Sequence, residues 1–170
     1  MSNVNPPHEV APVDPVADTL ALVVLKQFRV IFGSVRQHFR DVEQRCGVTG
    51  SQLWLLHETA GEPGIGVSDL ARKLSIHQST CSLLVEKLEA KGLIVKKRRT
   101  EDQRRVGLYL SEPAQKTIEA APGPAEGILP EALQGLSLET LLGLNENLAR
   151  LIDQLTIRDD RSADKPLSEL

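Results

Sequence analysis

The chain has 170 residues, of which 41% are hydrophobic and 25% charged, as expected for one soluble globular domain with its own core. Only 3% are aromatic, which argues against an all-β fold and against proteins that stack single-stranded bases on aromatic side chains. The formal net charge is −3, whereas nucleic-acid-binding domains are usually basic. The whole-chain charge therefore argues against a nucleic-acid partner, unless the basic residues are concentrated in one segment.

The two ends of the chain are polar. Residues 1–16 hold four prolines and little periodicity, so we expect a flexible amino-terminal arm with no signal-peptide pattern. Residues 158–170 are expected to form a polar carboxy-terminal tail. The longest apolar run is too short to cross a bilayer, and two cysteines make no disulfide framework, so we expect a cytoplasmic protein.

A long helix is predicted over residues 17–46, followed by Gly47 in a left-handed conformation. Its apolar residues recur at steps of three and four, which is the helical period. A stripe of this length exceeds the need of a small core and indicates packing on another helix or subunit. The stripe consists of Leu20, Val24, Phe28, Ile31, Val35, Phe39, Val42 and Cys46.

Three further helices follow. Thr49 and Gln52 form a predicted capping box that opens a helix over about 50–60. Residues 61–66 form a loop, Ser68 is expected to cap a short helix over 69–74, and a brief turn follows. The third helix runs from about residue 77 to residue 91 and ends at Gly92.

The period then changes from 3.6 to 2, which predicts a β-hairpin over 93–111 with Val106, Leu108 and Leu110 on one face. Ser111 is expected to cap a helix that is interrupted near 122–124 and strained at Pro130. Ser137 is expected to cap a last helix over 138–157, with leucines at coiled-coil spacing.

A short helix, a tight turn, a longer helix and a basic hairpin are the element order of a winged helix-turn-helix. The predicted fold class is therefore mainly α with a small β-hairpin wing, in a single domain over 17–157 that has its DNA-binding lobe at 49–111. The helix after the turn would enter the major groove, and an arginine at the hairpin tip could enter the minor groove.

The charge is unevenly distributed and supports this fold. Between Ser68 and Leu110 there are ten basic and five acidic residues, a net charge of +5, and the rest of the chain carries −8. Six of those cations lie on the two arms of the hairpin, and phosphate is their natural complement.

Candidate DNA contacts follow from position and residue type. Apolar Cys81, Leu84, Val85 and Leu88 should face the core, which leaves polar positions that can bond bases or phosphates. Ordinary cap and surface residues would produce the same pattern on this helix. The candidates are Ser68, His77, Gln78, Ser79, Thr80, Ser82, Lys87, Lys96, Arg98, Arg99, Arg104 and Arg105.

The chain resembles the MarR family of bacterial winged-helix regulators over about residues 17–157. The resemblance rests on the sequences at 68–74, 78–80, 88–94 and 101–105. It implies a homodimer built from long helices at 17–46 and 112–157, a roughly palindromic operator, and a repressor released by a small phenolic or aromatic ligand or by oxidation. It also implies that Arg104 enters the minor groove and that Asp102 braces the wing by pairing with an arginine.

Two departures from the family pattern matter. Position 83 is often arginine in the family and is Leu83 here, so one phosphate or base contact is missing or is replaced by contact with a thymine methyl. The region after the wing is usually one unbroken helix, whereas residues 121–130 are rich in proline and glycine. We therefore expect a kink in the dimer arm or in the wall of the ligand pocket.

Candidate effector residues lie on the first two helices, between which family pockets usually open. His38, Arg40, Trp54 and His57 are the candidates for an anionic aromatic ligand such as an acid or a thioester, and ordinary packing explains each equally well. No zinc motif, phosphate loop, dinucleotide fingerprint or nucleophile elbow is present, so no metal, cofactor or enzymatic activity is expected.

Three functions remain open at this point. The first is a ligand-responsive DNA-binding regulator, which represses or activates according to promoter position. The second is an interaction module that antagonises another regulator without binding DNA, which Leu83 favours and the hairpin cations oppose. The third is a thiol-based sensor using Cys46 or Cys81, although Cys81 is expected in the core.

Overall fold

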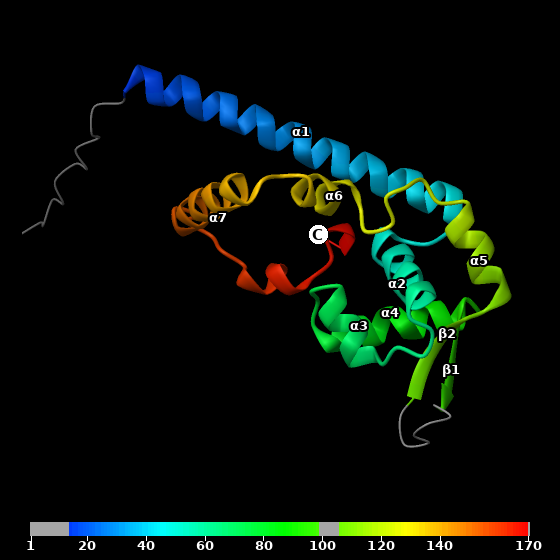
Figure 1. The fold of residues 1–170 in the computed structure, drawn as a ribbon. Helices are drawn as coiled ribbons and strands as arrows, with labels where there is room; N and C mark the ends of the chain where they lie inside the picture. The colour runs from blue at the N-terminus through cyan, green and yellow to red at the C-terminus, as the bar shows by residue number, and fades with distance from the viewer. Residues whose placement is uncertain (1–13, 99–105, 170) are drawn as a thin grey trace, which may run out of the picture. The chain divides into compact units, whose positions relative to one another are not determined.

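The computed structural model describes residues 14–98 and 106–169. The described residues form a mainly helical fold with a small two-stranded sheet (Figure 1), which confirms the predicted fold class. The elements are α1 (Pro15–Cys46), α2 (Gly50–Gly61), α3 (Val67–Lys73), α4 (Gln78–Ala90), β1 (Ile94–Arg98), β2 (Val106–Leu110), α5 (Glu112–Glu119), α6 (Ile128–Gln134), α7 (Leu138–Asp153), η1 (Asp160–Asp164) and η2 (Leu167–Glu169). None of the helices in these ranges combines the length and the apolar character needed to span a membrane.

The chain divides into two compact units between Ser34 and Val35, so α1 contributes to both. In the first unit, the described residues form only the beginning of α1. Most of their large apolar side chains are exposed, and Phe28 is half-buried. The second unit contains the end of α1 and all other elements, including the hydrophobic core.

Helix α1 confirms the predicted long helix and begins two residues earlier. Gly47 follows it at φ +66°, in the left-handed conformation expected of a residue that ends a helix. The predicted capping box is also confirmed. The Thr49 hydroxyl accepts a hydrogen bond from the Gln52 backbone N–H at 3.4 Å, and the Thr49 backbone N–H donates to Gln52 Oε1 at 3.1 Å.

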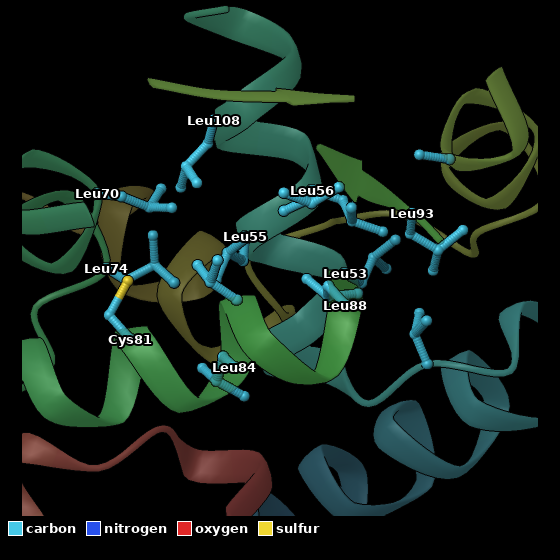
Figure 2. Packing of buried hydrophobic residues seen from close by; sticks show 14 of the residues in the cluster. Leu53, Leu55, Leu56, Leu70, Leu74, Cys81, Leu84, Leu88, Leu93 and Leu108 are labelled. Atoms are coloured by element: carbon cyan, nitrogen blue, oxygen red, sulfur yellow. The ribbon is translucent and has the colours of Figure 1, made fainter. Parts of the chain in front are cut away.

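The core holds α2, α3, α4 and the hairpin together (Figure 2). Leucines of α2 contact leucines of α3 and α4, and the four α4 residues predicted to face the core are all buried. Ile94 and Leu108 attach the two strands to the same cluster. Because α4 and the strands share one core, their outward faces are held in a fixed relation. The labelled core residues are Leu53, Leu55, Leu56, Leu70, Leu74, Cys81, Leu84, Leu88, Leu93 and Leu108.

The hairpin is anchored by a segment that the sequence had suggested was only loop. Strands β1 and β2 pair antiparallel with Ile94 opposite Leu110 and Arg98 opposite Val106. Ile65 forms a β-bridge with Leu108, whose N–H donates to the Ile65 carbonyl at 3.0 Å. Of the three residues predicted to share one face, Leu108 is buried and Leu110 half-buried, whereas Val106 is 51% exposed.

Several predicted helix details are wrong. Helix α3 begins at Val67 after Gly66, because the bridge at Ile65 fixes the preceding chain, so Ser68 is inside the helix and does not cap it. Ser111 stands at the start of α5, but its hydroxyl donates to the Gly92 carbonyl at 2.6 Å. Pro130 is in the first turn of α6, where its missing N–H removes no helical hydrogen bond, so the expected strain is absent there.

Helix α7 is shorter than expected. Ser137 caps it as predicted by accepting a hydrogen bond from the Thr140 N–H at 3.2 Å. The helix ends at Asp153 and not at residue 157, and Leu155 and Ile157 beyond it are exposed. The interruption between α5 and α6 is confirmed, and it includes a cis Gly123–Pro124 bond.

Candidate nucleic-acid interface

A tight turn joins α3 to α4, and α4 packs against α3. Ser75 adopts φ +53° in this turn, and His77 is the residue that caps α4. The His77 ring nitrogen Nδ1 accepts from the Ser79 backbone N–H at 3.3 Å and lies 2.7 Å from the Ser79 hydroxyl. The first turn of α4 is therefore fixed before any ligand binds, with the candidate DNA contact His77 as its cap residue.

The outward face of α4 is polar, as a helix that reads a DNA groove requires. Gln78, Ser79 and Lys87 are exposed, and Thr80 and Ser82 are half-buried. Leu83 interrupts this face and is 51% exposed. Ser68 is exposed on α3 beside the same turn, and it lines one open groove together with His77 and Gln78.

The cations of the lobe have different local partners. Lys96 pairs with Glu89 at 2.7 Å, and Lys97 Nζ lies 5.6 Å from the centre of the Tyr109 ring. Lys91 donates to the Gly47 carbonyl at 2.7 Å and thereby ties the end of α4 to the turn after α1. Exposed ion pairs are weak and can exchange for phosphate, so Lys96 stays a candidate, whereas Lys91 has a structural partner.

Four candidate residues lie outside the residues that the structure describes. They are Arg99, Asp102, Arg104 and Arg105, in the connection between β1 and β2. Their predicted roles in the wing stay predictions. Arg98, the last described residue of β1, is exposed at the end of the paired strands.

A small, largely apolar cavity lies between the end of α1, α2, the start of α6 and η2. It brings together two of the four effector candidates, His38 and Trp54. Arg40 is not in its wall and donates instead to Gln37 at 2.7 Å, while His57 is exposed elsewhere on α2. The cavity wall consists of Val35, His38, Phe39, Gly50, Ser51, Trp54, Glu126, Gly127, Ile128, Leu129, Pro130, Pro166, Leu167 and Ser168.

Sequence reasoning missed most of this wall. Val35 and Phe39 were visible in the apolar stripe of α1 but were interpreted only as packing residues. Residues 126–130 were recognised as a helix break and not as cavity wall. No periodicity in the sequence indicates that residues 166–168 return to α2, because that contact depends on tertiary structure.

The pKa of both cysteine thiols is raised, which lowers the fraction of reactive thiolate. Burial raises the pKa of the Cys81 thiol to about 11. Burial also raises the pKa of Cys46, and the charge of neighbouring Arg45 opposes this shift. Thiol sensors require a stabilised, accessible thiolate, and neither environment provides one.

Comparison with known proteins identifies the family. The sequence model of the MarR family matches residues 47–105, which include α2, α3, α4 and β1. A relative from Thauera aromatica, named for transcriptional regulation of the hcr operon, is 32% identical over 68% of this chain and 71% of its own. The transcriptional repressor MdtR of Bacillus subtilis is 24% identical over 79% of this chain and 87% of its own.

Solved structures agree with the sequence relatives. The MepR–DNA complex of S. aureus superimposes with a TM-score of 0.53 at 25% identity, covering 76% of this chain and 94% of MepR. The chain belongs to the MarR family of winged helix-turn-helix transcriptional regulators, which bind DNA and are not enzymes.

Proposed function

We propose that the protein is a homodimeric repressor that leaves its operator when a small aromatic molecule occupies the cavity. The observation that carries this proposal is the polar outward face of α4. The opposite, buried face of α4 packs on α2, and α2 also forms one wall of the cavity. Helix α2 thus contacts both α4, the proposed DNA-reading helix, and the proposed effector cavity. A ligand shifts the balance between two states by its difference in affinity for them.

Homodimer formation is supported by apolar surface that this chain leaves uncovered. Val24, Ile31 and Phe32 are exposed in the first unit of the chain. Within the described residues, α7 buries none of its side chains although leucines recur along it. A second copy is the occupant that fits, because two α4 helices about one DNA turn apart, ~10 base pairs, would read a pseudo-palindrome.

The effector is proposed to be an uncharged aromatic or phenolic compound. Among the described residues that line the cavity, none is lysine or arginine, and the nearly buried His38 is the polar group on its α1 wall. An acid would bring a charge into an apolar site with no guanidinium to pair with it, which is costly. The absence of Arg40 from this wall therefore favours a phenol over a carboxylate.

The DNA part of the proposal is tested by fluorescence anisotropy with duplex DNA from upstream of the chain's own gene. Replacing Gln78 by alanine should weaken specific binding and leave random-sequence binding nearly unchanged, because a base contact carries sequence information. Gln115→Ala, on α5, is the matched control. If the two variants behave alike, α4 does not read the sequence, and complete absence of binding to DNA would instead favour the antagonist function.

The effector part is tested by adding phenol and benzoate, one at a time, to the protein–DNA complex. Phenol should release the DNA at lower concentration than benzoate, and Trp54→Leu should reduce that difference. Equal potency of the two compounds, or stronger release by benzoate, would contradict the proposed effector class.

A further inference from the structure

The carboxy-terminal segment 159–169 belongs to the second unit of the chain and contacts α2 and the start of α4 there. Helix η2 packs on α2 near the carboxy terminus (Figure 1). Pro166, just before η2, is buried. The Ser51 backbone N–H donates to the Ser168 hydroxyl at 3.1 Å, and Ser168 lies 3.5 Å from where a side chain on Gly50 would start. Pro166, Leu167 and Ser168 of this segment also form one wall of the cavity.

The middle of the same segment contacts the start of α4. The His77 backbone N–H donates to the Asp164 carbonyl at 3.2 Å, at the residue that caps α4. Asp164 shares an open groove with Ser68, Arg72 and Gln78. Two of these three residues are candidates for DNA contact, and the third is an arginine.

We propose that residues 159–169 form an internal strap, which competes with DNA for the start of α4. A ligand in the cavity would hold this strap in its docked position. Docked, the strap places Asp164 among the residues that line the groove a DNA phosphate would approach, and the negative charges of Asp164 and of the phosphate repel each other. Because residues 166–168 are cavity wall, a ligand that packs on them favours the docked strap. DNA favours the undocked strap, so ligand and DNA oppose each other by linkage.

This inference rests on the proposed function for the direction of the ligand effect, but the competition with DNA is tested without any ligand. The probe is random-sequence duplex DNA, because phosphate repulsion acts on any sequence. The chain shortened to end at Arg158 should bind this duplex about fivefold more tightly than the full chain, the lower end of typical coupling. Trp54 is the single tryptophan and lines the cavity, so acrylamide quenching of its fluorescence reports undocking.

Removal of the segment also removes negative charge, so a charge-preserving variant is needed. The double substitution Pro166→Gly and Leu167→Ser should loosen the strap, tighten duplex binding and increase Trp54 quenching. Ala163→Ser, at an exposed position of the same segment, is the control and should change neither measurement. In the full chain, saturating duplex should increase Trp54 quenching.

Two outcomes would overturn the proposal. The first is a double variant whose Trp54 is more strongly quenched but whose affinity for the duplex equals that of the full chain. Undocking of the strap would then have no effect on DNA binding. The second is duplex binding that leaves Trp54 quenching of the full chain unchanged. Either result leaves DNA binding itself intact, whereas loss of all duplex binding would contradict the proposed function instead.

Discussion

At the scale of single residues, the two cysteines differ from sensor thiols in their surroundings. Cys81 is fully buried in the core face of α4, and burial raises its thiol pKa to about 11. The thiolate is the reactive form, so a raised pKa leaves less of it at neutral pH than an ordinary cysteine has. The geometry thus favours a filler role for Cys81 inside the DNA-binding lobe.

We predict that iodoacetamide at pH 7.5 modifies the native protein slowly and leaves Cys81 unmodified, as measured by mass spectrometry of peptides. Unfolding in urea should expose Cys81 and make both cysteines react at similar rates. Raising the pH toward 9 should accelerate Cys46 in the native state, because its thiolate fraction grows with pH. Rapid native modification of Cys81 would restore the thiol-sensor hypothesis.

Two glycines fix where the wing meets the loop after α2. A side chain on Gly107 would begin 2.7 Å from the Gly64 carbonyl oxygen and 2.9 Å from Gly64 Cα. Gly64 itself adopts φ +90°, and a side chain there would begin 2.8 Å from the Tyr109 hydroxyl. Both positions require the absence of a side chain so that β2 can pair with Ile65.

We therefore predict that Gly107→Ala destabilises the protein by about 1–3 kcal/mol, because the methyl group meets backbone that cannot move independently. The control is Gly143→Ala in α7, where nothing lies within 4 Å and alanine is the better helix former. Urea denaturation followed by circular dichroism measures both. Equal midpoints for the two variants would mean that β2 shifts to accommodate the side chain.

At the scale of elements, α4 has two faces with separate functions. Its buried face was predictable because apolar residues spaced by three and four must be covered in a soluble domain. Its outward face places Lys87 in solvent, and within the described residues Lys87 has no ion pair. Lys87 is therefore available for a phosphate without first losing a partner.

For Lys87→Ala we predict weaker DNA binding at all sequences and a salt dependence reduced by ~1 in slope, as expected for one lost phosphate contact. Lys116→Ala, which removes the same charge from an exposed position on α5, should leave the slope unchanged. Anisotropy titrations over a range of salt concentrations give the slopes. A slope for Lys87→Ala equal to that of the control would remove Lys87 from the interface.

Two of the corrections at element ends share one cause. Ser68 and Ser111 were assigned from local preference alone, and in both cases a contact between residues distant in sequence changed the outcome. The bridge between Ile65 and Leu108 moved the start of α3, and the Gly92 carbonyl took the Ser111 hydroxyl. Local preferences at helix ends amount to about 1 kcal/mol, which one tertiary hydrogen bond can match.

At the scale of the whole molecule, the apolar stripe of α1 changes environment along its length. Val42 is completely buried, whereas Leu20, Val24 and Ile31 are exposed. Exposed apolar side chains on a long amphipathic helix indicate a partner surface. A second copy covering them would explain why the stripe continues beyond the core.

Ile31→Glu is predicted to convert a dimer into monomers and to abolish tight operator binding, because the charge would be buried at the contact. Arg29→Glu, an exposed position of the same helix outside the stripe, is the control and should stay dimeric. Light scattering coupled to gel filtration gives the masses. Leu148→Glu tests the contribution of α7 in the same way, and a dimer that survives both stripe variants would place the interface elsewhere.

The sequence by itself determined the element order, the faces of α4 and the concentration of positive charge between Ser68 and Leu110. Periodicity and local charge are properties of neighbours in the chain, so they can be seen without a structure, even where the net charge of −3 concealed them. Tertiary structure alone decided that Ile65 joins the wing, that His38 and Trp54 share a cavity without Arg40, and that residues 164–168 return to α2 and α4. These contacts join residues far apart in sequence, and their formation depends on how the core closes, which no local pattern records.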